Sequence, residues 1–167
     1  DEGTYEGKQY CTAKFDAAWK GKPDDLRELS ALKHFESLHI ASDAGIGDAG
    51  LKQLARLKGL KYLSIFDDQV TDAGIAELSG LEQIQLLVLH QKNLTDAGLK
   101  SIARLKTLTG LVLDGSQITD DGLAELAPLK NLEAIRINNT KTTDAGLEHL
   151  VALKKLRVVG ASQTQIT

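Results

Sequence analysis

Apolar residues recur along the chain in a two-part pattern. In the first part they alternate with other residues at a spacing of two, as in Leu63, Ser64 and Ile65. In the second part they are spaced by three, as in Leu99 and Ile102. The first spacing is typical of a strand with one buried face, and the second of the buried stripe of a helix. Each unit is therefore predicted to be a strand, a turn and a short helix.

Equivalent positions of successive units lie 24 residues apart. A fixed period of this length indicates a solenoid, in which each unit buries its apolar face against its neighbours. The strand positions that we expect to be buried between sheet and helices are Leu38, Ile40, Leu63, Ile65, Leu87, Leu89, Leu111, Leu113, Ile135 and Ile137. The matching helix positions are Leu51, Leu54, Leu57, Ile75, Leu78, Leu81, Leu99, Ile102, Leu105, Leu123, Leu126, Leu129, Leu147, Leu150 and Leu153.

The turn before each helix carries the same short phrase, an acid, two small residues and an aliphatic residue. Its aspartates are Asp48, Asp72, Asp96, Asp120 and Asp144. An acid at a helix start can accept from unpaired backbone N–H groups and complement the helix dipole, so we expect these residues to cap their own helices. The small residues would let neighbouring units stack closely.

Lysines follow the last leucine of most helices, where a cation is favourable. They are Lys33, Lys58, Lys106, Lys130 and Lys154, and Glu82 interrupts the series. The alternative interpretation is a basic binding edge, which the net charge of −3 does not favour.

The first 25 residues depart from the pattern and are predicted to form a divergent N-terminal capping unit, with residues 26–167 as one continuous domain of repeats. A helix is expected to begin at Asp24 or Asp25, with Leu26, Leu29 and Leu32 toward the core. Four aromatic residues are expected to cover the open end of the core: Tyr5, Tyr10, Phe15 and Trp19.

The segment "LKTLTGLVLDGSQITDDGLAELAPLKNLEAIRI" resembles leucine-rich-repeat proteins. The 24-residue spacing and the "TDAGL" helix start resemble the bacterial repeats related to the cysteine-containing subclass. This resemblance implies an α/β leucine-rich-repeat solenoid, curved, with a parallel sheet on the concave face and helices on the convex face. It also implies binding of proteins or peptides, usually on the concave face.

The chain departs from that family in two places. The usual Asn or Cys position after the strand holds Asp68, Lys92, Ser116, Thr140 and Thr164, so a side-chain ladder there is expected to be absent or reduced. Thr142 replaces the aliphatic residue found at Val70, Leu94 and Ile118, and a weaker turn is expected around it.

Side chains between the buried strand positions should face the concave surface. The predicted partner-binding site has an apolar centre and a polar border, and its residues are Tyr62, Phe66, Leu86, Val88, His90, Val112, Asp114 and Arg136. A contiguous exposed apolar patch usually marks a contact site. The alternative is that these are strand-forming residues shielded by the inner curve.

Two histidines and the cysteine are the remaining candidates for chemistry. His90 and Asp114 share a position on neighbouring strands and are expected to hydrogen-bond. A catalytic or metal role for this pair lacks a third group, because no nucleophile is evidently placed beside it. His39 is expected to stand alone at the other end of the sheet. Cys11 is interpreted as a lone structural thiol, with a reactive thiol as the alternative.

Composition limits the remaining possibilities. The chain has 167 residues, 42% of them hydrophobic and 26% charged, as expected for a soluble globular domain. The net charge of −3 argues against binding to nucleic acid or anionic membranes, and no apolar run is long enough for membrane insertion. The chain lacks the common nucleotide, zinc and hydrolase motifs, and "DAGIGDAG" at Asp43 is interpreted as a loop. We therefore expect no cofactor, no metal and no enzymatic activity.

The predicted function is non-catalytic recognition of a protein or peptide through the concave sheet. The alternatives are a passive scaffold or spacer within a larger protein or complex, and a glycan or small-molecule site with Tyr62 and Phe66 as stacking surfaces. The last strand, near Val159, is expected to need cover from a missing segment, a partner or a dimer contact. The chain has no methionine, which fits a processed exported protein and an excised fragment equally, so the compartment stays open.

Overall fold

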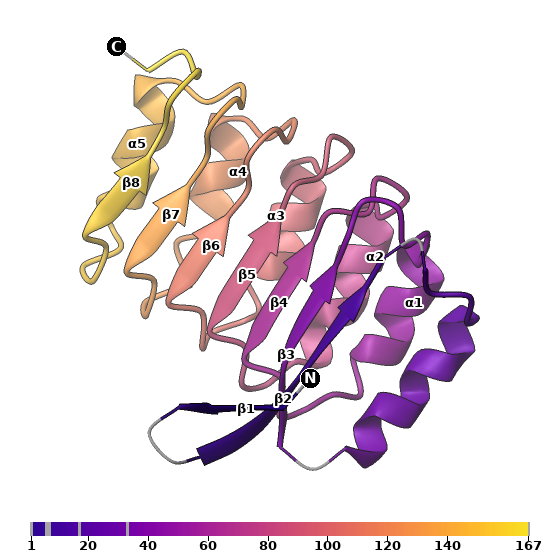
Figure 1. Cartoon of the computed structure of the whole chain (residues 1–167). Coiled ribbons are helices and arrows are strands. Elements are labelled where there is room, and N and C mark those ends of the chain that lie inside the picture. The colour runs from indigo at the N-terminus through magenta and orange to yellow at the C-terminus, as the bar shows by residue number, and fades with distance from the viewer. Residues whose placement is uncertain (1, 6–7, 17, 33, 167) are drawn as a thin grey trace.

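The chain forms one sheet with helices stacked along one of its faces (Figure 1). The computed structural model describes residues 2–5, 8–16, 18–32 and 34–166, with side chains described from Ala13 onwards. The strands are β1 Glu2–Tyr5, β2 Lys8–Phe15, β3 Phe35–Ile40, β4 Tyr62–Ile65, β5 Leu86–Leu89, β6 Gly110–Val112, β7 Ala134–Arg136 and β8 Val158–Gly160. The helices are η1 Pro23–Ala31, α1 Gly47–Leu54, α2 Asp72–Glu77, η2 Leu78–Gly80, α3 Asp96–Ile102, α4 Asp120–Glu125 and α5 Asp144–Leu150.

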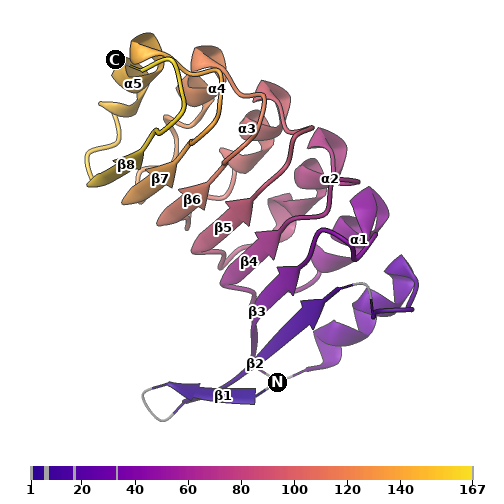
Figure 2. The same ribbon diagram turned by 45° about the horizontal axis from the view of Figure 1, so that its top comes forward.

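The strands lie in sequence order across the sheet. From β2 to β8 each strand is parallel to the next, and β1 adds an antiparallel edge beside β2. Figure 2 shows the helices on the opposite side of the stack from the strands. A helix is about 10 Å wide whereas strands lie about 4.8 Å apart, so the helical side is longer and the sheet forms the inner face. The predicted α/β solenoid is confirmed.

The core lies between the sheet and the helices. All ten strand positions predicted to be buried are at most 1% exposed, which confirms the alternation. The helix positions are buried as well, except Leu147, which is half-buried in the last helix. One continuous apolar layer therefore runs from the first repeat to the last.

At the N-terminal end, the rings of Phe15 and Trp19 meet edge to face, 5.2 Å apart, and pack against the core. Helix η1 begins at Pro23, before the predicted aspartates, and Asp25 instead accepts from the Lys22 backbone N–H at 2.7 Å. Leu26 is buried and Leu29 half-buried, but Leu32 is 45% exposed because the helix has already ended at Ala31. The side chains of Tyr5, Tyr10, Cys11 and Lys33 lie outside the described part of the chain.

The repeated aspartates do not cap their own helices, contrary to the sequence prediction. The caps are threonines one residue earlier: the hydroxyl oxygens of Thr71, Thr95 and Thr143 each accept from the backbone N–H two residues on. Four of the aspartates, Asp48, Asp72, Asp96 and Asp120, instead accept hydrogen bonds from the threonine at the start of the next repeat's helix. Asp96, for example, accepts from the Thr119 backbone N–H at 2.9 Å and from its hydroxyl at 2.7 Å.

The same arrangement joins Asp48 to Thr71, Asp72 to Thr95 and Asp120 to Thr143. The Thr143 N–H is the main cause of a lowered pKa for Asp120, helped by the Thr143 hydroxyl, the Gly146 N–H and His149, while burial opposes it. Because the folded-state pKa lies below the ordinary 3.8, the stability that this carboxylate contributes is present above pH 3.8 and is lost as the pH falls through the folded-state value.

The glycine of the repeated phrase makes room for these carboxylates. A methyl group on Gly122 would lie 2.1 Å from Oδ1 of Asp96, and one on Gly98 would lie 2.5 Å from Oδ1 of Asp72. Asp48 and Asp120 lie equally close to Gly74 and Gly146. The small residues therefore permit close stacking of the repeats, as predicted. The group that packs against each of these glycines is the aspartate carboxylate of the preceding repeat.

We expect Asp96→Ala to lower the free energy of unfolding by about 2 kcal/mol, because it removes two hydrogen bonds to Thr119. Chemical denaturation would measure the loss. Gly122→Ala provides the specific control: it should destabilise the native protein but cost less in the Asp96→Ala background, where the carboxylate is gone. Equal cost in both backgrounds would contradict this inter-repeat contact.

Other polar side chains also connect neighbouring repeats. The ladder at the family's usual position is reduced: Lys92 pairs with Asp68 of the preceding repeat at 2.8 Å, whereas Ser116, Thr140 and Thr164 bond to carbonyls of their own turns. The next residues take over, since the amides of Asn93 and Gln117 donate to the preceding repeat's backbone carbonyls. These two amide bonds between repeats thus lie one position further along the turn than the family's usual ladder.

The structure also shows the contacts of Thr142 and of three of the lysines that follow the helices. Thr142 is fully buried and its hydroxyl pairs with that of Thr140 at 3.0 Å, and the weaker turn there stays a prediction. Lys106 and Lys154 donate to carbonyls at the ends of their helices, as predicted. Lys58 instead reaches the next repeat, where it contacts the Gly80 carbonyl and Glu82.

Candidate functional site on the concave sheet

The strand register brings the predicted site residues together on the concave face. Tyr62 on β4 aligns with Leu86 on β5, and Leu86 with Gly110 on β6. Val88 on β5 aligns with Val112 on β6, which aligns in turn with Arg136 on β7. Because neighbouring strands lie about 4.8 Å apart, these side chains form a continuous surface.

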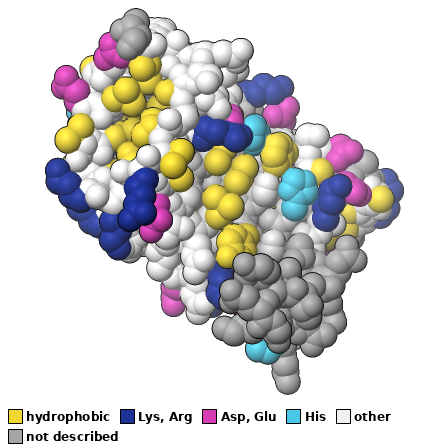
Figure 3. All heavy atoms as spheres, turned by 60° about the vertical axis from the view of Figure 1, so that its left-hand side comes forward, with side chains coloured by type: hydrophobic (Ala, Val, Ile, Leu, Met, Phe, Trp, Pro, Cys, Tyr) yellow, Lys and Arg dark blue, Asp and Glu magenta, His cyan; other side chains and the backbone are white. Residues whose placement is uncertain are grey.

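This surface differs from the core in its exposure. Tyr62 is 42% exposed, and Phe66, Leu86, Val88 and Val112 are half-buried, whereas the core positions between them are closed to solvent. Figure 3 shows hydrophobic side chains along the concave sheet with histidine and charged side chains beside them. The inner curve therefore does not shield the apolar strip completely.

Three rings form a stack at the ends of β3, β4 and β5. The Phe66 ring lies face to face with His90, with centroids 4.5 Å apart and an interplanar angle of 11°. On its other side it packs against His39 at 5.4 Å, and Nδ1 of His39 lies 3.3 Å from the Ser64 hydroxyl. The sequence prediction that His39 stands alone is therefore wrong. His39 and Phe66 are not at aligned positions of their strands, so their contact is diagonal. Comparing equivalent positions of the repeats in the sequence therefore does not reveal it.

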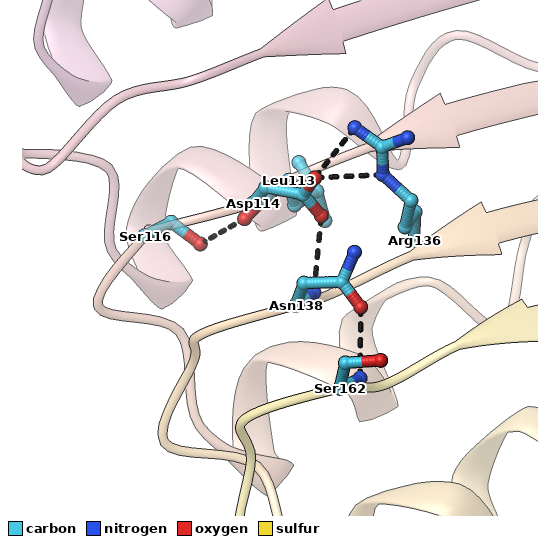
Figure 4. Close-up of polar contacts among 6 residues, drawn as sticks. All are labelled: Leu113, Asp114, Ser116, Arg136, Asn138 and Ser162. Atoms are coloured by element: carbon cyan, nitrogen blue, oxygen red, sulfur yellow. Dashed lines mark hydrogen bonds and ion pairs between the residues drawn. The ribbon is translucent and has the colours of Figure 1, made fainter.

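The predicted hydrogen bond between His90 and Asp114 is not formed. Asp114 lies next to Arg136, whose Nε and Nη2 atoms both approach its Oδ2 at 2.6 Å (Figure 4). The other carboxylate oxygen accepts from the Asn138 backbone N–H at 3.0 Å, and the Asn138 side chain accepts from the Ser162 N–H. The Asp114 carboxylate, which was expected to hydrogen-bond to His90, thus accepts from a guanidinium and a backbone amide instead.

An apolar groove extends the surface toward the C-terminal end. Its hollow of about 200 Å³ crosses β6, β7 and β8, and its lining includes Gly110, Ala134, Gly160 and Val158. Because glycine has no side chain, the side chain of the neighbouring residue can lie flat over it: a methyl group on Gly110 would meet Leu86 at 2.8 Å. Sequence reasoning missed this groove, although the run of small residues in aligned positions could have indicated it.

The described residues offer little support for other chemistry. Among them no group of three or more His, Cys, Asp or Glu side chains could hold a metal ion. The glycine-rich segment that starts at Asp43 is a loop only in its first half, because α1 begins at Gly47. The Asp67 carboxylate accepts from the Ile46 and Gly47 N–H groups of this segment at 2.5 and 3.0 Å. Within the described residues, every helix is too short or too polar to cross a membrane.

The C-terminal end of the core is open to solvent. Val159 occupies the strand position that Ile135 holds in the preceding repeat, yet it is 44% exposed against 1% for Ile135. A hollow of about 460 Å³ lies there between α5 and β8, lined by apolar residues with Lys154 and Arg157 among them. This end matches the prediction of a strand without its cover.

Comparison with solved structures identifies the architecture as the leucine-rich-repeat solenoid. The LRR ectodomain of the plant membrane receptor kinase GASSHO1/SCHENGEN3 from Arabidopsis thaliana, solved in complex with CASPARIAN STRIP INTEGRITY FACTOR 2, superposes with a TM-score of 0.55. It is 17% identical in sequence, and the match covers 95% of this chain and 18% of that one. At such identity the likeness concerns the fold alone.

Two bacterial proteins share the fold. Internalin C2 from Listeria monocytogenes matches with a TM-score of 0.69 and 26% identity, over 86% of this chain and 58% of that one. An internalin (inlF) from the same species matches with a TM-score of 0.54 and 20% identity, over 86% of this chain and 52% of that one. The chain thus spans little more than half the length of either internalin. No protein-family model and no curated protein matches the chain.

Proposed function

We propose that this protein is a non-catalytic recognition module that binds a protein or peptide through its concave sheet. The observation that carries the proposal is the half-exposed apolar strip centred on Tyr62 and Phe66, which alternates with a closed core. Aromatic side chains inside and polar groups at the border are typical of protein contacts. The plant ectodomain that shares the fold was solved with a bound partner, which supports the same role here.

The proposed contact residues have distinct roles. Tyr62 and Phe66 are the anchors, because large aromatic side chains dominate binding energy at interfaces. Leu86, Val88 and Val112 supply the aliphatic surface between the anchors and the border. The border consists of His90, Asp114 and Arg136. We further propose that the repeats belong to the bacterial type related to the cysteine-containing subclass, on the strength of the "TDAGL" phrase.

A double variant, Tyr62→Ala with Phe66→Ala, tests the site. We expect it to lose about 2 kcal/mol or more of binding free energy toward a partner captured from the source cell, while its unfolding free energy changes far less than for a core truncation. Calorimetry of the purified pair would measure the affinity. Leu32→Ala, an exposed leucine away from the sheet, is the matched control and should bind normally.

Unchanged affinity in a folded double variant would contradict the concave site. The binding surface would then be sought at the open C-terminal end near Val159, and the scaffold interpretation would gain support. A captured partner that is a glycan or small molecule would favour stacking on Tyr62 and Phe66 over protein recognition.

A further inference from the structure

Positive charge gathers at the edge of the solenoid where the last three helices lead into strands. The loops that join α3 to β6, α4 to β7 and α5 to β8 span residues 103–109, 126–133 and 151–157. Their only acidic residue is Glu133, although the whole chain has a net charge of −3. A group of Lys and Arg side chains is visible at the left of Figure 3. The basic residues of the three loops are Arg104, Lys106, Lys130, Lys154, Lys155 and Arg157.

Hydrogen bonds between the loops hold this edge in a fixed arrangement. The Arg157 backbone N–H donates to the Glu133 carbonyl at 2.8 Å. The Asn131 side chain joins all three loops, because its N–H donates to the Lys106 carbonyl at 3.0 Å and its oxygen accepts from Nζ of Lys155 at 2.8 Å. The positive charges therefore lie on a preformed surface.

The same edge is electrically balanced in the N-terminal half of the solenoid. There Lys58 pairs with Glu82 at 2.8 Å, and Lys61 pairs with Glu36 at 2.7 Å. The six basic side chains of the last three loops, by contrast, make no ion pair within the described part of the chain. Uncompensated positive charge is thus confined to the C-terminal half of this edge.

The helix ends account for only part of this charge. Lys106 and Lys154 donate to carbonyls at the ends of their own helices. The side chains of Lys130 and Arg157 are exposed and make no bond to any described residue. The charge therefore exceeds what the helix ends require, and it favours an anionic ligand.

A polar hollow of about 320 Å³ lies in the same edge, and its lining includes the side chains of Thr107 and Asn131. Gln83, Gln85 and Glu133 also line it, and their side chains make no bond among the described residues. Free amides and a free carboxylate suit hydroxyl groups, which both donate and accept hydrogen bonds. The carboxylate opposes an acidic polypeptide in the hollow, because like charges placed together disfavour binding. The lining has no aromatic residue on which a nucleic-acid base could stack.

We propose that this edge binds an anionic polysaccharide. Its sulfate or carboxylate groups lie on the basic side chains, and its hydroxyl groups bond to the amides and the carboxylate of the hollow. The basic side chains supply the attraction, and the hollow supplies the preference for a sugar. This inference goes beyond the proposed function, because none of these residues belongs to the proposed concave contact.

Binding to heparin, a sulfated polysaccharide, and to polygalacturonate, a carboxylated one, tests the inference on the full chain. Surface plasmon resonance should detect binding to at least one of them and none to neutral dextran. The variant Lys130→Gln, Lys155→Gln, Arg157→Gln should bind about tenfold more weakly. Its affinity should also depend less steeply on salt, because fewer anionic groups are neutralised.

A matched control removes the same charge elsewhere. Lys52→Gln and Lys100→Gln lie on helices α1 and α3, and Lys141→Gln lies in the loop from β7 to α5, at the opposite edge. This triple variant should bind the polysaccharide nearly as well as the native chain. Equal losses in both triple variants would mean that net charge alone drives binding, and would overturn the site.

A further variant separates a polysaccharide from an acidic polypeptide. Gln83→Ala with Gln85→Ala keeps every charge and removes two free amides from the hollow. It should weaken polysaccharide binding about fivefold, because hydrogen bonds to the sugar are lost. Binding of polyglutamate, the acidic polypeptide probe, should stay weak and unchanged.

The remaining outcomes each decide the question. No binding to either polysaccharide, or tighter binding to polyglutamate than to both, would overturn the inference. The Tyr62→Ala, Phe66→Ala variant should bind polysaccharide normally. Failure of the concave site and failure of this edge are therefore distinguishable.

Discussion

Replacing Leu89 with alanine is expected to lower the free energy of unfolding by about 2–5 kcal/mol. Leu89 is fully buried on β5, in the middle of the apolar layer, with repeats on both sides. Truncation removes buried methyl groups and leaves a cavity that the neighbouring repeats fill only in part. Because a solenoid is stabilised through contacts between adjacent repeats, the loss weakens both interfaces. Urea denaturation followed by circular dichroism measures the effect, and Leu113→Ala should behave alike.

The neighbouring residue on the other face is the control. Val88 is half-buried on the concave surface, so Val88→Ala should cost about 1 kcal/mol or less. Equal losses for Val88→Ala and Leu89→Ala would mean that the alternation does not divide core from surface.

Replacing Asp67 with alanine is expected to cost about 2–4 kcal/mol. Asp67 is 1% exposed, and its carboxylate accepts from the backbone N–H groups of Ile46, Gly47 and Gln69. These bonds hold the irregular loop before α1, where Gly45 and Gly47 both have positive φ angles. Without the carboxylate, buried N–H donors lose their partner, which costs more than the net value of the bonds themselves. Thermal or chemical unfolding would measure the loss, and hydrogen exchange would locate it in residues 41–47.

Asp68 is the matched control for this variant. Its side chain is about half exposed and pairs with Lys92 at the surface, so Asp68→Ala should cost less than about 1 kcal/mol. If the two alanine variants had the same stability, the loop would be held by something other than the Asp67 carboxylate.

The sequence by itself determined the repeat, the strand and helix faces and the direction of the core. Alternation by two and spacing by three assign Leu89 or Ile102 to the interior without any knowledge of its neighbours, because the geometry of one strand or helix settles which face a residue occupies. The fixed period then aligns equivalent residues, so the concave columns through Tyr62 and Val88 could be predicted as well.

Only the tertiary structure decided which side chains at non-equivalent positions of neighbouring repeats contact one another. Asp96 meets Thr119, 23 residues on, and His39 meets Phe66, 27 residues on, whereas the period aligns residues close to 24 apart. Such contacts depend on the rotation and separation of adjacent repeats, and on side-chain rotamers that choose among several partners within reach. For the same reason Asp114 pairs with Arg136 in preference to His90. The groove over Gly110 and Gly160 likewise depends on how Leu86 and Arg136 lie across their neighbours, which only the packed sheet determines.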